Sequence, residues 1–132
     1  MIVTREMDYA VRTLRALHHH GLLSAAAVAE REHMQKAITL KTLKQLHSGG
    51  LVESRRGVSG GYVLARSAEE MTLYDVFTAI GEPIYVNRCQ REGYHCENAA
   101  SGDCGACREF ARIQAVLNEE LRRHPLSDIF GE

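Results

Sequence analysis

Four cysteines lie close together in one segment of the 132-residue chain, and no other part of the chain carries a thiol. The segment runs from Arg88 to Phe110 and reads RCQREGYHCENAASGDCGACREF. Its Gly, Asn, Ser and Asp content is typical of a loop, and an apolar helical pattern begins directly after it. Four thiolates can hold a [2Fe–2S] or [4Fe–4S] cluster, and they can equally hold tetrahedral zinc. We therefore expect a metal site whose ligands are Cys89, Cys96, Cys104 and Cys107.

Other chemistry stays open as an alternative. Switching between thiols and a disulfide needs only two close cysteines. The C-x2-C-x2-C-x3-C run of bacterial ferredoxins is absent, although a small iron–sulfur electron-transfer protein remains the alternative from another functional class. His95 stands next to Cys96, but no base or oxyanion-hole pattern accompanies it. We expect that the protein is not an enzyme and that it has no small-molecule substrate.

Composition places the chain among single-domain globular proteins. Hydrophobic residues make up 45% and charged residues 25% of the sequence, and a chain of this length can bury one modest core. No apolar run approaches the roughly 18 residues of a membrane helix, and the N-terminal MIVTREMDYA lacks the apolar core of a signal peptide. We therefore expect a cytoplasmic protein without membrane contact, where clustered cysteines more often bind metal or sense redox state than form disulfides.

Basic residues concentrate in the middle of the chain, although the formal net charge is −1. Between residues 36 and 66 a single acid, Glu53, opposes them. Such a segment fits the electrostatic footprint of a protein that binds a polyanion, and the alternative is an ordinary solvated face. The basic residues are Lys36, Lys41, Lys44, Arg55, Arg56 and Arg66.

Apolar periodicity around the basic segment predicts a mainly α-helical fold with one small β-hairpin. Capping residues and glycine stops predict helices over 4–21, 25–32 and 35–48, of which the last two form a helix-turn-helix. Short strands at 51–52 and 62–64 enclose RRGVSGG, whose glycines allow a tight turn. A β-hairpin that follows a helix-turn-helix is a wing. A fourth helix is expected from Thr72 to Gly81.

A long last helix, over 106–124, is expected after the cysteines. The Cys104-x2-Cys107 pair would lie at its positive end, which favours thiolates. The helix carries an apolar stripe, which is covered either by a second copy of the chain or within one subunit. The stripe consists of Phe110, Ile113, Leu117 and Leu121.

The residues predicted to contact DNA lie on the third helix and the wing. The lysines and arginines would contact phosphates, and short polar side chains would contact base edges, with Arg56 as a reader of the minor groove. The base-edge candidates are Gln35, Thr39 and Thr42. The full set is Gln35, Lys36, Thr39, Lys41, Thr42, Lys44, Arg55, Arg56, Ser59 and Gly60.

The order of these motifs resembles one known family over nearly the whole chain. A helix-turn-helix, the wing RRGVSGGY, the helix start TLYDV and C-x6-C-x7-C-x2-C before a long helix are similar to the winged-helix iron–sulfur regulators typified by IscR and NsrR. The resemblance implies a homodimeric transcription factor, acting as a repressor on pseudo-palindromic operators. Its recognition helix would be Gln35 to Ser48. Its signal would be iron–sulfur status, redox state or nitric oxide.

The resemblance also implies a ligand set. The three family cysteines correspond to Cys89, Cys96 and Cys104. The fourth ligand of the IscR type is a histidine three residues after the third cysteine, where this chain has Cys107. The NsrR type uses an aspartate near the start of helix 1 of the partner subunit, and Asp8 stands at that position. The x6 and x7 spacings also exceed those of the IscR type, a difference that a loop tolerates at modest entropic cost.

We thus expect one compact domain with three parts. Residues 1–81 form the winged helix-turn-helix, residues 82–109 the cysteine-rich metal-binding loop, and residues 110–132 the dimerisation helix and C-terminal tail. A regulator of the same fold that binds zinc, or that switches through its thiols, is the alternative function.

Overall fold

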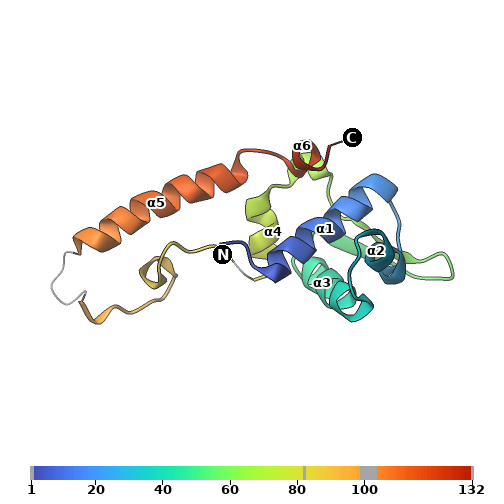
Figure 1. Cartoon of the computed structure of the whole chain (residues 1–132), viewed down its shortest axis with the longest axis horizontal. Helices are drawn as coiled ribbons and strands as arrows, with labels where there is room; N and C mark the ends of the chain where they lie inside the picture. Colours follow the sequence, from blue (N-terminus) through green and yellow to red (C-terminus); the bar gives the residue numbers. More distant parts are fainter. Residues whose placement is uncertain (1, 82, 99–103, 132) are drawn as a thin grey trace.

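The computed structural model describes residues 2–81, 83–98 and 104–131. Figure 1 shows α1 to α4 and a two-stranded hairpin gathered into one body, from which the long α5 extends. The elements are α1 (Arg5–His20), α2 (Ala25–Arg31), α3 (Lys36–Ser48), β1 (Val52–Arg55), β2 (Gly61–Leu64), the 3-10 helix η1 (Ala68–Glu70), α4 (Leu73–Ala79), the 3-10 helix η2 (Arg88–Gln90), α5 (Gly105–Arg122) and α6 (Leu126–Phe130). Within the described ranges, no helix is long and apolar enough to cross a membrane.

Helix α1 is the centre of the core. Thr4 caps it, because its hydroxyl oxygen accepts a hydrogen bond from the Met7 N–H at 3.2 Å, and Gly21 ends it with a φ of 69°. Its apolar face, which includes Met7, Leu14 and Leu17, is at most 2% exposed. This face packs against α3 and α4, so the helix-turn-helix and the helix that follows the wing share one core.

The helix-turn-helix forms as the sequence predicts. Ser24 caps α2 by accepting the Ala27 N–H at 3.1 Å, and α2 packs across α3. The end of α3 then approaches α4 very closely: a Cβ atom at Gly49 would lie 2.5 Å from the Cβ atom of Ala79. This approach is possible only because residue 49 has no side chain.

The wing is a short antiparallel hairpin that is hydrogen-bonded to the chain just before α2. Its register pairs Val52 with Leu64 and Arg55 with Gly61. Leu23 extends the pairing, because the Tyr62 N–H donates to the Leu23 carbonyl oxygen at 2.8 Å and the Leu23 N–H donates back at 3.1 Å. The mainly helical fold with a β-hairpin wing is therefore confirmed.

The C-terminal tail contains a helix that the sequence did not predict. Helix α5 ends at Arg122, and the chain continues into α6, which packs against η1 and α1. Leu126 is fully buried, and its N–H donates to the Met71 carbonyl oxygen at 2.8 Å. Leu126 thereby joins the winged-helix core, a contact that local periodicity does not reveal.

Candidate metal centre and nucleic-acid interface

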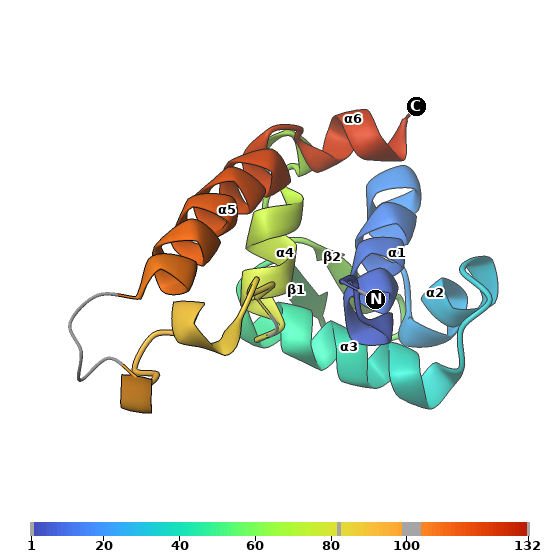
Figure 2. The same ribbon diagram turned by 60° about the vertical axis from the view of Figure 1, so that its left-hand side comes forward.

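The four cysteines lie in two parts of the chain: Cys89 and Cys96 follow α4, and Cys104 and Cys107 lie at the start of α5. The first of these parts contains η2, which lies beside α5 (Figures 1 and 2). Cys104 is the N-cap of α5, and its sulfur accepts a hydrogen bond from the Cys107 N–H at 3.4 Å. Cys89 belongs to η2, and Cys96 lies farther along the same segment. We call residues 83–98 the cysteine arm. The i, i+3 spacing of the two α5 cysteines places both sulfurs at the first turn, where the helix dipole favours negative charge.

Gln90 joins the cysteine arm to α5. Its side-chain Nε2 donates to the Cys89 sulfur at 3.3 Å, to the Cys107 carbonyl oxygen at 3.2 Å and to the Cys107 sulfur at 3.6 Å. The Cys89 and Cys107 thiols also form a hydrogen bond with each other. Two sulfurs that lie far apart in the sequence are thus brought to within 3.6 Å of the same amide nitrogen.

This contact makes the two thiols chemically unequal. The hydrogen bond from the Gln90 amide, with those from Cys107 and Asn87, lowers the pKa of Cys89. The hydrogen bond to Cys89 raises the pKa of Cys107. Cys89 is therefore the thiol of the pair that loses its proton more readily, and the thiolate is the form of cysteine that binds metals and attacks electrophiles.

The remaining predicted ligands do not join this pair within one chain. Among the residues that the structure describes, no group of three or more His, Cys, Asp or Glu side chains is arranged to hold a metal ion. Asp8 on α1 pairs instead with Arg12 at 2.9 Å. The chemistry of Cys89, Cys104 and Cys107, on η2 and at the start of α5, nevertheless suits a thiophilic metal, because such metals prefer thiolate ligands.

A second glutamine, Gln114, holds the start of the cysteine arm on α5. Its Oε1 accepts the Val86 N–H at 2.7 Å, and its Nε2 donates to the Ile84 carbonyl oxygen at 2.9 Å. Neither Gln90 nor Gln114 is among the site residues predicted from the sequence. The signal for Gln114 was its spacing of seven residues from Cys107, which places both on the same face of α5.

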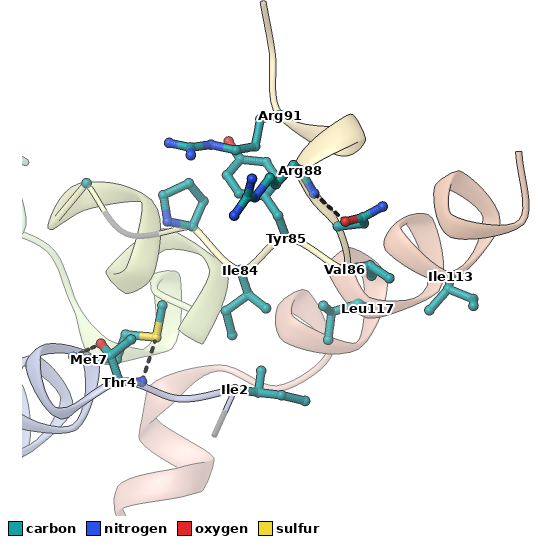
Figure 3. Close-up of a pocket in the computed structure, with 13 residues that line it drawn as sticks. Ile2, Thr4, Met7, Ile84, Tyr85, Val86, Arg88, Arg91, Ile113 and Leu117 are labelled. Atoms are coloured by element: carbon teal, nitrogen blue, oxygen red, sulfur yellow. Dashed lines mark hydrogen bonds between the residues drawn. The ribbon is translucent and has the colours of Figure 1, made fainter. Parts of the chain in front are cut away.

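A groove of about 850 Å³ lies between the start of α1, the cysteine arm and α5. Figure 3 shows its apolar lining residues, with Ile84 from the cysteine arm, Ile113 and Leu117 from α5, and Ile2 from the start of the chain. Arg88 and Arg91 line it from the cysteine arm, and the Arg91 guanidinium lies 5.9 Å from the centroid of the Tyr85 ring. The groove is mainly apolar and has cations along one side.

The prediction of which α3 residues face DNA is partly wrong. Gln35, Lys36, Lys41 and Lys44 are exposed, as expected. Thr39 and Thr42 are only 0% and 4% exposed, and their hydroxyls donate to the carbonyl oxygens of Gln35 and Ile38 at 3.0 and 2.9 Å. They continue the buried stripe of Leu43 and Leu46, because positions 39, 42, 43 and 46 recur at helical spacing. Neither side chain can contact a base edge from this position.

The wing presents its basic residues to solvent. Arg55, Arg56 and Ser59 are exposed, whereas Gly60 is half-buried at the turn. Arg55 pairs with Glu53 at 2.8 Å, so part of its charge is neutralised. Within the described residues Arg56 forms no ion pair. Arg56 is therefore the wing cation most available to a polyanion.

Comparison with known proteins places these features in context. Residues 3–132 match the model of the Rrf2 family, described as iron-dependent transcriptional regulators. The chain is 36% identical over 97 residues to the HTH-type transcriptional regulator IscR of Pectobacterium carotovorum subsp. carotovorum (strain PC1), which covers 70% of this chain and 59% of that protein. It is 33% identical over 104 residues to a regulator of Haemophilus influenzae, covering 75% and 67%.

Solved structures share the fold. CymR, the global cysteine regulator of B. subtilis, superposes with a TM-score of 0.72 at 22% identity, covering 98% of this chain and 96% of that one. The T. potens IscR structure gives a TM-score of 0.70 at 22% identity, covering 98% and 85%. The chain spans less than two thirds of the length of the Pectobacterium relative that it matches.

Proposed function

Because this chain belongs to the Rrf2 family of iron-dependent transcriptional regulators, we propose that it is a homodimeric, DNA-binding repressor controlled by an iron–sulfur cluster. The observation that carries the proposal is the approach of the Cys89 and Cys107 sulfurs to one amide nitrogen of Gln90, at 3.3 and 3.6 Å, beside a third thiol, Cys104, whose sulfur accepts the Cys107 N–H. The family resemblance inferred from the sequence is confirmed, and the relatives are transcriptional regulators rather than enzymes, as expected.

DNA binding is supported by the exposed cations of α3 and the wing. Lys36, Lys41 and Lys44 lie on the solvent-facing side of α3, and Arg56 extends from the wing without an ion-pair partner in the described chain. We propose that α3 enters the major groove and that the lysines contact phosphates. Arg56→Ala should cost about 1–3 kcal/mol of operator binding if the side chain reads a base edge.

Lysine replacements on α3 provide a second test of DNA binding. Lys41→Ala should reduce the dependence of log K on log salt by about one unit, since one phosphate contact releases about one counterion. Fluorescence anisotropy of an operator duplex across salt concentrations measures both effects. The control is Arg112→Ala, which removes an exposed cation from α5 instead. Unchanged binding by both Arg56→Ala and Lys41→Ala would exclude this DNA interface.

The metal proposal rests on the donor set. Cys89, Cys104 and Cys107 would hold a [2Fe–2S] or [4Fe–4S] cluster together with Cys96 or with Asp8 from the second subunit. When bound, the cluster supplies a redox- and nitric-oxide-sensitive centre, and the protein supplies thiolates and the positive end of α5. Zinc is the second candidate, because four sulfurs also satisfy its tetrahedral preference.

Anaerobic purification with an absorption spectrum and iron, sulfide and zinc analysis tests the metal. Broad visible absorption with iron and sulfide supports the cluster, and one zinc per chain in a colourless protein supports the second candidate. A metal-free, colourless protein would contradict both and leave a regulator that switches through its thiols. Comparing Asp8→Ala with Cys96→Ala then identifies the fourth ligand, since only the replacement of the true ligand should change the spectrum.

The dimer is supported by the apolar surface of α5. Ile113 and Val116 are 38% and 54% exposed in the single chain, and Ile113 and Leu117 also line the apolar groove beside α1. A two-fold arrangement would cover both surfaces at once. Val116→Glu should shift the protein to monomer in sedimentation velocity. Ala115→Glu is the control, because position 115 lies on the side of α5 opposite Ile113 and Leu117.

We propose that the cluster controls DNA affinity by setting the separation of the two α3 helices in the dimer. A ligand shifts binding only by its differential stabilisation of the DNA-competent form. Operator affinity should therefore differ between cluster-loaded and cluster-free protein at fixed salt. Equal affinities would refute this regulatory step without affecting the DNA-binding proposal.

A further inference from the structure

We propose that Gln90 and Gln114 are positioning residues that hold the cysteine arm on α5 and so bring Cys89 to Cys107. The inference rests on the proposed role of these thiols as metal ligands. Neither glutamine supplies a ligand itself. Each instead uses its side-chain amide to connect the cysteine arm, which approaches α5 from the winged helix, to a fixed turn of α5.

Gln114 fixes the start of the cysteine arm. It binds the Ile84 carbonyl and the Val86 N–H, the two backbone groups that an adjacent β-strand would bind at this point of an extended segment. Its Nε2 also donates to the Asn118 side-chain oxygen at 3.0 Å. Asn118 thereby holds the amide in the orientation that serves both backbone groups.

Gln90 fixes the next turn of the arm. Its Nε2 contacts the sulfur of Cys89 and both the carbonyl oxygen and the sulfur of Cys107, at 3.2 to 3.6 Å. A single donor group is therefore shared between the two elements that carry the thiols. The seven-residue spacing of Cys107 and Gln114 places the two attachments two turns apart along one face of α5.

Hydrogen bonds matter here because burial contributes little. Tyr85 is 39% exposed and Arg88 is exposed, while Cys89 and Gln90 are only half-buried. An arm with so little buried apolar surface depends on its few specific contacts for its position. Removing one amide should therefore reduce the docked population of the arm markedly.

The first test measures the proximity of the thiols in reduced, metal-free, full-length protein. Cys96→Ser and Cys104→Ser leave only Cys89 and Cys107, which dibromobimane joins by forming two S–C bonds with loss of two bromides. Mass spectrometry gives the ratio of bridged to singly modified protein. Gln90→Met and Gln114→Met should each lower this ratio about fivefold, which corresponds to the loss of about 1 kcal/mol for one net hydrogen bond.

Matched variants separate positioning from packing. Methionine fills nearly the same volume as glutamine, so a role in packing alone predicts no change in either Met variant. Gln114→Glu should fall between Gln and Met, because its carboxylate still accepts the Val86 N–H but cannot donate to the Ile84 carbonyl. Glu109→Gln is the control on α5, since Glu109 is exposed and pairs with Arg112. Bridging in both Met variants that equals the parent would overturn the inference.

The second test uses Co²⁺ as a probe of the intact set of four cysteines. Both Met variants should bind Co²⁺ more weakly than the parent, measured by sulfur-to-cobalt charge-transfer absorption, while Glu109→Gln binds normally. A parent that binds no metal, with bridging still reduced in both variants, would refute the metal function and support the positioning role. Normal Co²⁺ binding with unchanged bridging would refute the positioning role and leave the metal function standing.

Discussion

The ion pair between Arg15 and Glu32 should be a main attachment of the helix-turn-helix to the core. The Arg15 guanidinium on α1 donates through Nε to Oε1 of Glu32 at 3.1 Å and through Nη2 to Oε2 at 2.5 Å. Glu32 is the C-cap of α2 and therefore lies in the turn that sets the direction of α3. Its side chain is only 10% exposed, whereas that of Arg15 is 46% exposed.

These exposures set the expected energies. Arg15→Met should leave a mostly desolvated carboxylate without its bidentate partner, at a cost of about 1.5–2 kcal/mol, the lower part of the range for charged hydrogen bonds because water reaches the pair from the arginine side. The hydrogen bond to Glu32 raises the pKa of Arg15. A base whose pKa is raised on folding stabilises the fold fully at pH values below its unfolded-state pKa. This stabilisation is lost only as the pH rises through the folded-state pKa. The arginine contribution is therefore constant across neutral pH.

A double-mutant cycle with urea unfolding measures the coupling. Arg15→Met and Glu32→Gln should together cost less than the sum of the single changes, with a coupling energy of at least about 1 kcal/mol. Protein concentration is held constant, because the proposed dimer would contribute to stability. Arg12→Met is the matched control: Arg12 pairs with Asp8 on the same helix at 2.9 Å, but both side chains are well exposed, so about 0.5 kcal/mol or less is expected. A coupling energy equal to that of an exposed pair would refute the reasoning.

Three further substitutions test the packing that supports the interface, each by urea unfolding. Gly61→Ala should destabilise the fold and weaken operator binding, because the new Cβ would lie 2.4 Å from the Leu23 carbonyl oxygen and would separate the wing from α2; wild-type stability would contradict this. Gly49→Ala should cost several kcal/mol, since its Cβ would meet backbone and side-chain atoms of Ala79 at 2.5–2.9 Å. Thr13→Val should be neutral or stabilising by about 1 kcal/mol, because the Thr13 hydroxyl is buried without a partner in the described structure; a large loss would reveal an unseen partner.

Local patterns in the sequence were sufficient to predict the winged helix. Thr4 and Ser24 cap their helices as expected, and the glycines around the wing turn allow the hairpin. These features depend on residues that are close in sequence, so periodicity and capping rules capture them. The same holds for Cys104 and Cys107, whose position at the start of α5 follows from where the apolar pattern begins.

The features that the sequence did not predict correctly are of two kinds. Some depend on contacts between residues that are distant in the sequence, and others are polar residues that occupy buried positions of a helix. Thr39 and Thr42 were assigned to the DNA face because they are polar, although their spacing belonged to the buried stripe and their hydroxyls are satisfied by the preceding turn. The residue type of Gln90 and Gln114 does not predict their role, because their hydrogen bonds form only when the cysteine arm lies against α5. The position of α6 depends on contacts of Leu126 with the core and with Met71, which lies 55 residues earlier in the chain.

The C-terminal end of helix α5 is anchored to the winged helix. Just after α5, Pro125 pairs with Thr72 and Leu126 is buried in the core. The Arg122 guanidinium also lies 3.6 Å from the centroid of the Tyr74 ring on α4. The 18 residues of α5 place the cysteine end roughly 27 Å from this anchored end. A tilt of about 5° at the anchored end therefore displaces the cysteine end by roughly 2 Å. Thr72 pairs with Pro125 and also caps α4, so the C-terminal end of α5 is connected directly to the helix that follows the wing.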